Sequence, residues 1–135
     1  MNENTSELLE LALSVRENAY APLSHFKVGA VVVGGGGARY VGCNVESPTY
    51  TLSTHAEMNA IDTAIASGER RITRVVIVLD SPHVIFPCAL CRQKITEFAD
   101  LDIEVTAFTL DGTHTTKTIG ELYPESFTLQ DLDKK

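Results

Sequence analysis

The sequence predicts a single α/β domain, and three observations support this fold class. Residues 74–79 form an almost continuous apolar run, which is typical of a strand that helices bury on both faces. Segments with apolar residues at helical spacing lie on either side of this run along the chain. Two other regions pair short strand-like segments across glycine-containing turns, which predicts hairpins. A chain of 135 residues suits one domain with its own core, and we expect it to span residues 1–135.

The first predicted element is a helix that starts near Asn4 and ends at about Ala19. Asn4 and Glu7 are spaced like the two members of a capping pair. The segment 20–23 contains a proline and ends the helical pattern. The inward-facing residues of this helix are Leu8, Leu11, Ala12 and Val15.

A β-hairpin is predicted next, with strands at residues 28–33 and 39–45. Four glycines at 34–37 separate the strands and suit a turn with unusual dihedral angles. A phosphate-binding loop is the alternative, but the glycines lack the lysine and the strand-to-helix context of such loops. Cys43 lies in the second strand, where we expect a small buried residue.

Two helices are predicted to begin at residues that can bind a metal. One begins at His55 and ends near Gly68, and the other runs from about Cys88 to Phe98. With the strand 74–79 between them, they form an α-β-α unit that brings both helix starts to one edge of a sheet.

The last two strands are predicted at residues 103–110 and 115–119. Asp111 and Gly112 lie between them and are a strong signal for an antiparallel hairpin. The sequence contains no internal repeat or low-complexity linker that would indicate a second domain.

His55, Cys88 and Cys91 together predict a catalytic zinc site. Cys88 and Cys91 are three residues apart at a helix start, where the helix dipole favours thiolates. One imidazole and two thiolates leave one position of a tetrahedral zinc open for chemistry. Glu57 lies two residues after His55, and this spacing does not stack the two side chains on one helical face. We therefore expect Glu57 to move protons beside the metal rather than to bind it.

Each part of this pattern has a simpler interpretation. Thr54 and Glu57 match a capping box, which is a common feature of helix starts. The Cys-x-x-Cys pair can be a redox pair or half of a four-cysteine zinc site, although Cys43 is the only further thiol. The ordered combination of histidine, glutamate and two cysteines at two helix starts favours the catalytic zinc.

The other three histidines are weaker candidates for metal ligands. His83 precedes Cys88 by five residues, but it lies in a loop and has no adjacent acid. His25 and His114 have no partner in sequence, so we expect them to be surface or hydrogen-bonded residues.

The composition favours a small ligand over a nucleic acid. Asp and Glu outnumber Lys and Arg by 18 to 11, which gives a net charge of −7. A protein that binds nucleic acid usually presents a basic face, so we expect no nucleic-acid partner. The sequence shows no apolar run long enough to span a membrane and no signal-peptide pattern. We therefore expect no membrane association, a cytoplasmic location and unpaired cysteines.

These motifs resemble those of the cytidine deaminase family, in particular its small enzymes that act on free nucleosides. H-x-E followed by P-C-x-x-C is the general signature of zinc-dependent nucleobase deaminases. Residues 24–30, 42–46 and 87–93 are similar to the family's first-strand motif, ribose-binding segment and metal helix. The resemblance implies a three-layer α/β/α sandwich on a five-stranded mixed sheet. It also implies one Zn²⁺ per subunit and the hydrolysis of cytidine and deoxycytidine to uridine and deoxyuridine plus ammonia, a step of pyrimidine salvage.

The resemblance also implies roles for single residues. Glu57 would pass protons from water to N3 of the cytosine ring and then to the leaving amine. Asn44 and Glu46 would hydrogen-bond the ribose 3′-hydroxyl, Phe26 would pack against the nucleoside, and the Ala56 amide would contact the pyrimidine carbonyl. From the residues alone, simpler interpretations come first: Asn44 ends a strand, Glu46 is a solvated acid and Phe26 is a core residue.

The C-terminal segment resembles the family as well. Residues 120–124 and Phe127 match a segment whose phenylalanine reaches the site of a neighbouring subunit, which implies a homotetramer. The alternative is that Phe127 packs the tail onto its own chain.

Three parts of the sequence differ from the family's common pattern. The first metal ligand is commonly a cysteine followed by Ala-Glu-Arg, whereas this chain has His55 and Met58. The two changes are electrostatically consistent with each other. A neutral imidazole at position 55 removes the negative charge of a cysteine thiolate, so no arginine is needed at position 58 to offset it. Ala89 replaces a common glycine, and residues 47–49 replace a common Asn-Ala-Ser. The altered segment motivates an alternative substrate, a modified cytosine nucleoside such as a blasticidin-type antibiotic or an N4-substituted cytidine.

Two rival function classes are each disfavoured by a feature of the sequence. A polynucleotide deaminase is disfavoured by the acidic composition and by the hairpin at Asp111 and Gly112, since such relatives typically join these strands by a helix. A zinc-binding interaction domain without catalysis would have no use for Glu57 as a proton carrier.

Overall fold

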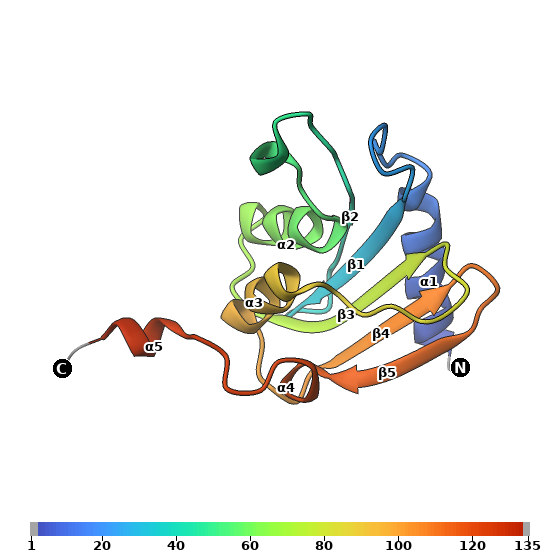
Figure 1. Cartoon of the computed structure of the whole chain (residues 1–135). Helices are drawn as coiled ribbons and strands as arrows, with labels where there is room; N and C mark the ends of the chain where they lie inside the picture. The colour runs from blue at the N-terminus through green and yellow to red at the C-terminus, as the bar shows by residue number, and fades with distance from the viewer. Residues whose placement is uncertain (1–2, 134–135) are drawn as a thin grey trace.

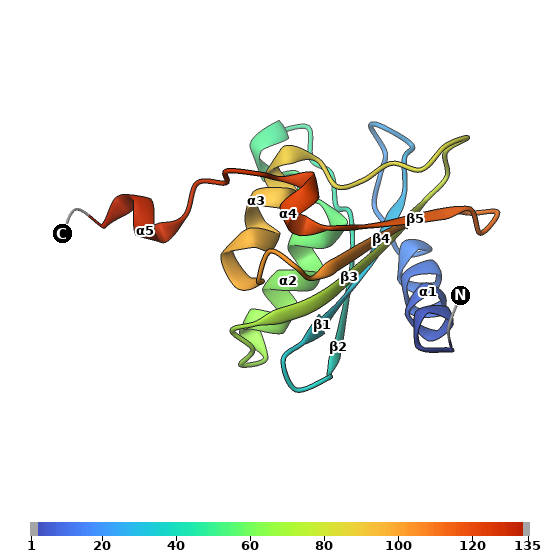
Figure 2. The same ribbon diagram turned by 90° about the horizontal axis from the view of Figure 1, so that it is seen from below.

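A five-stranded mixed sheet forms the middle layer of an α/β/α sandwich in the computed structural model, which describes residues 3–133 (Figure 1). Helix α1 (Glu3–Arg16) covers one face, and helices α2 (Ala56–Ala66) and α3 (Ala89–Phe98) cover the other (Figure 2). This architecture confirms the predicted fold class. The strand order is β2-β1-β3-β4-β5. The strands are β1 (Val28–Gly34), β2 (Arg39–Cys43), β3 (Ile72–Leu79), β4 (Glu104–Thr109) and β5 (His114–Thr118).

Strand β3 is the central strand, as its apolar run predicts. It pairs antiparallel with β1 and parallel with β4, so the sheet is mixed. Val75 and Ile77 face the core under α2 and α3, whereas Val76 and Val78 face the core under α1. Because successive side chains of a strand point to opposite faces, a strand between two helical layers must be apolar at nearly every position.

The two predicted hairpins are both present. Strand β1 pairs antiparallel with β2, and β4 pairs antiparallel with β5. The turn glycines Gly37 and Gly112 have φ angles of 94° and 92°, which glycine adopts without the steric cost of a Cβ atom. The four glycines at 34–37 therefore serve the hairpin turn, as predicted.

Helices α2 and α3 begin at the same edge of the sheet. Strands β2 and β3 both run antiparallel to β1, so their carboxyl ends lie on one side, and each is followed along the chain by one of these helices. Gly42 lets α2 lie directly on β2, because a Cβ atom there would come within 2.4 Å of the Ala60 nitrogen. The predicted α-β-α unit thus brings the two helix starts together.

The boundaries of α1 differ from the prediction. Asn4 lies inside the helix rather than at its cap, and its Oδ1 accepts a hydrogen bond of 2.7 Å from Arg39 Nη2. The helix ends at Arg16 rather than Ala19, because residues 17–19 continue in tighter turns, with the Ala19 amide donating to the Arg16 carbonyl at 3.0 Å. Of the predicted inward-facing residues, Leu8 and Ala12 are buried, whereas Leu11 and Val15 are half-buried.

Two strand ends also differ from the prediction. Strand β2 ends at Cys43, and Val45 forms only isolated bridges to Tyr20 and Thr54. Ile119 begins the short helix α4 (Ile119–Leu122) instead of ending β5, because Thr118 and Glu121 form a capping box there.

The C-terminal tail leaves the sandwich after α4. Helix α5 (Leu129–Leu132) lies apart from the sheet in both views (Figures 1 and 2). Within residues 3–133, no helix combines the length and the apolar composition that crossing a membrane requires.

Candidate active site

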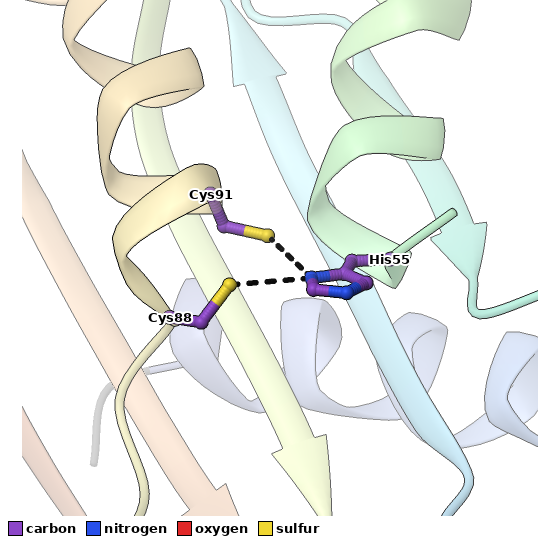
Figure 3. Close-up of side chains that lie close together, drawn as sticks. All are labelled: His55, Cys88 and Cys91. Atoms are coloured by element: carbon purple, nitrogen blue, oxygen red, sulfur yellow. Dashed lines mark hydrogen bonds between the residues drawn. The ribbon is translucent and has the colours of Figure 1, made fainter. Parts of the chain in front are cut away.

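The three predicted metal ligands meet where α2 and α3 begin. His55 is the N-cap residue of α2, Cys88 is the N-cap residue of α3, and Cys91 lies in the first turn of α3. The sulfur atoms of both cysteines lie 3.3 Å from His55 Nδ1 (Figure 3). These side chains come from segments 33 to 36 residues apart in sequence, so the fold, not the local chain, creates the cluster.

The donor set fits a tetrahedral zinc ion. The three ligand atoms all lie within 4.8 Å of one another. A tetrahedral zinc with Zn–S of about 2.3 Å and Zn–N of about 2.0 Å separates nitrogen from sulfur by about 3.5 Å, close to the observed spacing. No other group of three or more ligand-type side chains with this proximity occurs among the described residues. His55, Cys88 and Cys91 are therefore the residues that would hold a metal, with one position left open.

Burial makes the free thiol of Cys91 a poor acid. Cys91 is fully buried, and its pKa is raised first by desolvation and then by the charges of Glu57 and Cys88. A divalent cation reverses this preference, because it stabilises the thiolates at the same position. A bound cation would therefore convert this buried thiol to the thiolate that a metal needs.

Glu57 is a buried carboxyl group beside the metal ligands. It lies in the first turn of α2, and only 5% of its surface is exposed. Desolvation raises its pKa, while its own backbone N–H, His55 and Cys91 oppose that rise. A raised pKa makes the carboxylate a better proton acceptor than a solvent-exposed one, which suits general acid–base work.

A cavity of about 300 Å³ opens over this cluster. His55, Glu57 and Cys88 line it, and so do Asn44 and Glu46. The remaining wall is mainly apolar, as is usual for a small-molecule site with a few polar groups that fix orientation. It consists of Phe26, Val28, Ala56, Ile77, Leu79, Ile85, Phe86 and Pro87, with Ser24 as a further polar member.

Asn44 and Glu46 reach this cavity, but both also bind the backbone. Asn44 is 7% exposed, accepts from the Val28 amide at 2.9 Å and donates to the Phe26 carbonyl at 2.8 Å. Glu46 accepts from the Leu23 amide and from the amide and hydroxyl of Ser24. The Ser24 hydroxyl is the main reason why the pKa of Glu46 is lowered, so this carboxylate stays ionised.

The other predicted site residues divide into two groups. Phe26 is 38% exposed and lines the cavity, as does Ala56. Phe127 does not line it: this side chain is 55% exposed on the tail, and its carbonyl accepts from Gln93 Nε2 at 2.7 Å. Packing of Phe127 into the cavity of its own chain is therefore absent.

The simpler interpretations of the motif residues can now be tested. The N-cap of α2 is His55, not Thr54, and it has no side-chain capping bond, so the capping box is not formed. Thr54 instead accepts from Asn59 Nδ2 at 3.0 Å. Cys43 is half-buried on β2 and does not join the metal cluster, which argues against a four-cysteine site.

The remaining histidines lie outside the metal cluster. His83 and His25 are exposed in loops. His114 stacks on Phe108 with ring centroids 4.8 Å apart, and its Nδ1 lies 3.1 Å from the Gly112 carbonyl oxygen. The expectation that His25 and His114 are surface or hydrogen-bonded residues is confirmed.

Sequence reasoning missed several residues that shape the site. Ile85 and Phe86 line the cavity, and the only sequence signal for them is an apolar pair directly before the metal helix. Arg92 donates to the Pro87 carbonyl at 2.6 Å and to the Leu122 carbonyl at 2.7 Å, which fixes the turn that carries the first cysteine. These contacts depend on the tertiary fold.

Comparison with known proteins places this site in a family. A sequence model described as the cytidine and deoxycytidylate deaminase zinc-binding region matches residues 2–107. The cytidine deaminase of Halalkalibacterium halodurans is 34% identical over 126 residues, which cover 93% of this chain and 96% of that protein. The cytidine deaminase of Sporosarcina psychrophila is 33% identical over 129 residues, with coverage of 96% and 95%.

Solved structures agree with this assignment. The crystal structure of the cytidine deaminase from Burkholderia pseudomallei superposes with a TM-score of 0.87 at 36% identity, covering 94% of this chain and all (100%) of that chain. The cytidine deaminase from Mycobacterium tuberculosis gives a TM-score of 0.81 at 28% identity, with coverage of 95% and 100%. The chain therefore belongs to the cytidine and deoxycytidylate deaminase family and is a deaminase-type hydrolase.

Proposed function

We propose that this enzyme hydrolyses cytidine and deoxycytidine to uridine and deoxyuridine with release of ammonia. The observation that carries the proposal is that the buried carboxyl group of Glu57 lines one cavity of about 300 Å³ together with His55 and Cys88, two of the three clustered metal-ligand side chains. This volume lies at the lower end of the range for small-molecule sites, which suits a single nucleoside. The relatives described above are themselves named cytidine deaminases, which supports the same substrate class.

The chemistry divides between a zinc ion and Glu57. Zinc held by His55, Cys88 and Cys91 would supply Lewis acidity that lowers the pKa of a water molecule toward neutrality. Glu57 takes the proton of the attacking water and delivers it to N3 of the cytosine ring as the hydroxyl oxygen bonds to C4. It then carries the proton of that C4 hydroxyl to the amine, the C4–N bond breaks, and ammonia leaves as the C4 carbonyl forms. Its burial supports this double role, because desolvation favours the protonated form that the acid step needs.

The rest of the cavity orients the nucleoside. Ala56 is the first residue of α2, so its N–H has no partner within the helix and can donate to the pyrimidine carbonyl. Asn44 and Glu46 keep free hydrogen-bonding capacity after their backbone contacts and can bind the ribose 3′-hydroxyl. Phe26 supplies an aromatic surface on which the base packs.

The charges around the cavity favour a nucleoside over a nucleotide. A second hollow of about 210 Å³ adjoins the cavity and shares Asn44, Glu46 and His55 with it. The described residues that line the two hollows include the carboxyl groups of Glu46 and Glu57 but no lysine or arginine. A 5′-phosphate would therefore meet a negative charge without any cation to pair with it.

A substrate panel tests this proposal. We expect the zinc-loaded protein to release ammonia from cytidine and deoxycytidine, with kcat/KM for the 5′-monophosphates lower by about 100-fold or more because of charge repulsion. Ammonia release and the loss of cytidine absorbance measure turnover. An N4-substituted cytidine in the same panel tests the alternative substrate class. Turnover of that compound alone, or of the monophosphates alone, would overturn the proposal.

The alternative substrate lacks support from the cavity. It was motivated by the altered segment 47–49, yet these residues line neither of the two hollows. Ser47 and Ser53 instead bind each other, with the Ser47 amide donating to Ser53 Oγ at 2.9 Å. We therefore retain unmodified cytidine and deoxycytidine as the proposed substrates.

We further propose that the enzyme is a homotetramer in which Phe127 reaches a neighbouring cavity. Three large apolar side chains of the tail are mostly exposed: Phe127 at 55%, Leu129 at 76% and Leu132 at 61%. Helix α5 lies apart from the sheet in both views (Figures 1 and 2), whereas the Phe127 carbonyl accepts a hydrogen bond from Gln93 on α3. Burying such a tail against another copy of the chain would remove apolar surface from water.

Light scattering and a Phe127→Ala variant test this assembly. We expect a mass four times the 14.7 kDa of one chain. Phe127→Ala is expected to raise KM for cytidine by about tenfold, because one aromatic contact to the substrate is lost. Leu132→Ala, on the same tail, is the matched control and should leave KM within about twofold. A fully active monomer would contradict the proposal.

The proposed zinc ligands also require reduced thiols, and we infer a cytoplasmic location and a role in pyrimidine salvage. Cys43, Cys88 and Cys91 are all free in the structure. A reducing compartment keeps such thiols available for the metal. Free cytidine and deoxycytidine are the substrates that a salvage enzyme would use.

A further inference from the structure

The segment between α1 and β1 is held in large part by residues 44–46, which directly follow β2. Residues 22–26 are exposed and contribute little to the hydrophobic core. The Tyr20 amide donates to the Asn44 carbonyl at 2.9 Å, and the Glu46 amide donates to the Tyr20 carbonyl at 2.9 Å. The conformation of residues 22–26, which include Phe26 of the cavity wall, therefore depends on polar contacts.

Ser24 is the central contact of this segment. Its hydroxyl donates to one carboxylate oxygen of Glu46, while its amide and that of Leu23 donate to the other oxygen at 3.0 Å each. The same hydroxyl accepts from the Phe26 amide at 3.0 Å. His25, between these residues, has a φ angle of 57°, a left-handed conformation that costs energy for a residue other than glycine. The hydrogen bonds of Ser24 offset that cost.

The Glu46 carboxylate keeps one acceptor site free in this arrangement. A carboxylate has about four lone-pair sites. On Glu46, the two backbone amides use one oxygen, and the Ser24 hydroxyl uses one site on the other. The remaining site can accept a substrate hydroxyl, and its direction is set by the Ser24 bond. Ser24, Phe26 and Glu46 all line the cavity, so the bridge lies at the place where a nucleoside would bind.

We propose that Ser24 is a positioning residue for nucleoside recognition, which rests on the proposed function. Its single hydroxyl ties the carboxylate of Glu46, which binds the sugar, to the backbone of Phe26, which packs against the base. Loss of the hydroxyl frees both groups at once. Loss of the Ser24 hydroxyl should weaken nucleoside binding and leave proton transfer at Glu57 unchanged. Ser24 is not among the contacts of Glu57 or of the metal ligands.

Steady-state kinetics with cytidine test this role. Ser24→Ala is expected to raise KM by about tenfold and to change kcat by no more than about twofold, as the loss of one charge-assisted hydrogen bond does. Ser24→Thr keeps the hydroxyl and should restore KM to within about threefold. Ser67→Ala is the matched control, since that hydroxyl donates to the Thr63 carbonyl at the far end of α2. Zinc content should stay the same in all variants.

A double-mutant cycle separates positioning from a general structural role. Independent substitutions multiply their fold-losses in kcat/KM. If Ser24 acts through Glu46, the double variant Ser24→Ala, Glu46→Ala should show a smaller fold-loss in kcat/KM than the product of the fold-losses of the two single variants. Amide hydrogen exchange at Phe26 should be about tenfold faster in Ser24→Ala. An unchanged KM, a product of independent losses or unchanged exchange at Phe26 would each overturn the proposal. A wild-type chain without any nucleoside turnover would instead refute the proposed function, and the exchange measurement would still decide whether Ser24 holds the segment.

Discussion

Replacing Glu57 with glutamine is expected to abolish deamination while zinc stays bound. We expect kcat for cytidine to fall by about 10³- to 10⁴-fold, because the amide can neither accept the proton of the attacking water nor carry a proton to the leaving amine. Glutamine has the same shape as glutamate, so the buried position, which is 5% exposed, stays filled. Glu57 is not one of the three metal-ligand side chains, so zinc content should remain at one ion per chain.

The same substitution should stabilise the metal-free protein. Burial raises the pKa of Glu57 in the folded state above its unfolded value, so the ionised carboxylate is disfavoured in the fold. When folding raises the pKa of an acid, the contribution of that acid to the free energy of unfolding is fully present below its unfolded-state pKa. This contribution is lost as the pH rises through the folded-state pKa. Glutamine does not ionise, so the metal-free Glu57→Gln variant does not lose stability in this way. Its thermal midpoint should exceed that of the metal-free wild type, and the difference should grow from acidic to neutral pH.

Matched controls make both outcomes decisive. Glu10 is exposed on α1, so Glu10→Gln changes the same charge without touching the cavity and should leave kcat and the thermal midpoint nearly unchanged. Retained turnover in Glu57→Gln would exclude Glu57 as the proton carrier. Loss of zinc in that variant would show that the carboxylate holds the metal, contrary to the ligand set derived from His55, Cys88 and Cys91.

Much of the fold was predictable because its signals are local. The apolar run of β3 reports burial on both faces, and Gly68, with a φ angle of 103°, follows the end of α2 as predicted. The two helix starts could be placed at one edge because parallel strands share the side on which their carboxyl ends lie. The metal cluster follows from this topology once His55 and Cys88 are located at those starts.

The remaining features depend on contacts between distant segments. Asn44 and Glu46 were predicted to face a substrate, but no sequence pattern indicates that they also hold the backbone of residues 23–28. Ser24 contacts Glu46 because the fold brings the segment after β2, 22 residues away in sequence, beside it. The early end of α1 has a similar origin, since Tyr20 pairs with Val45 instead of continuing the helix. Such long-range pairings leave no periodic signal in one sequence.

Replacing Cys91 with alanine is expected to remove both the zinc and all measurable activity. Cys91 is fully buried at the first turn of α3, and its loss leaves only His55 and Cys88, too few protein ligands for a stable tetrahedral site. Metal analysis after dialysis against a mild chelator should find close to one zinc per wild-type chain and almost none in the variant. Added zinc should raise the thermal midpoint of the wild type but not of the variant, because only a ligand that binds the folded state stabilises it.

Acidity should release the metal from the wild type in the same assay. Zinc needs thiolates, and burial raises the pKa of the Cys91 thiol, so protons compete with zinc increasingly as pH falls. Cys43→Ala is the matched control, because this half-buried thiol on β2 is outside the cluster and should leave zinc content and turnover unchanged. If Cys91→Ala kept its zinc, or if Cys43→Ala lost it, the metal would be held by a different set of residues. Because the three ligand atoms converge from two helix starts, we expect the loss of any one to have the same effect as a chelator on the intact enzyme.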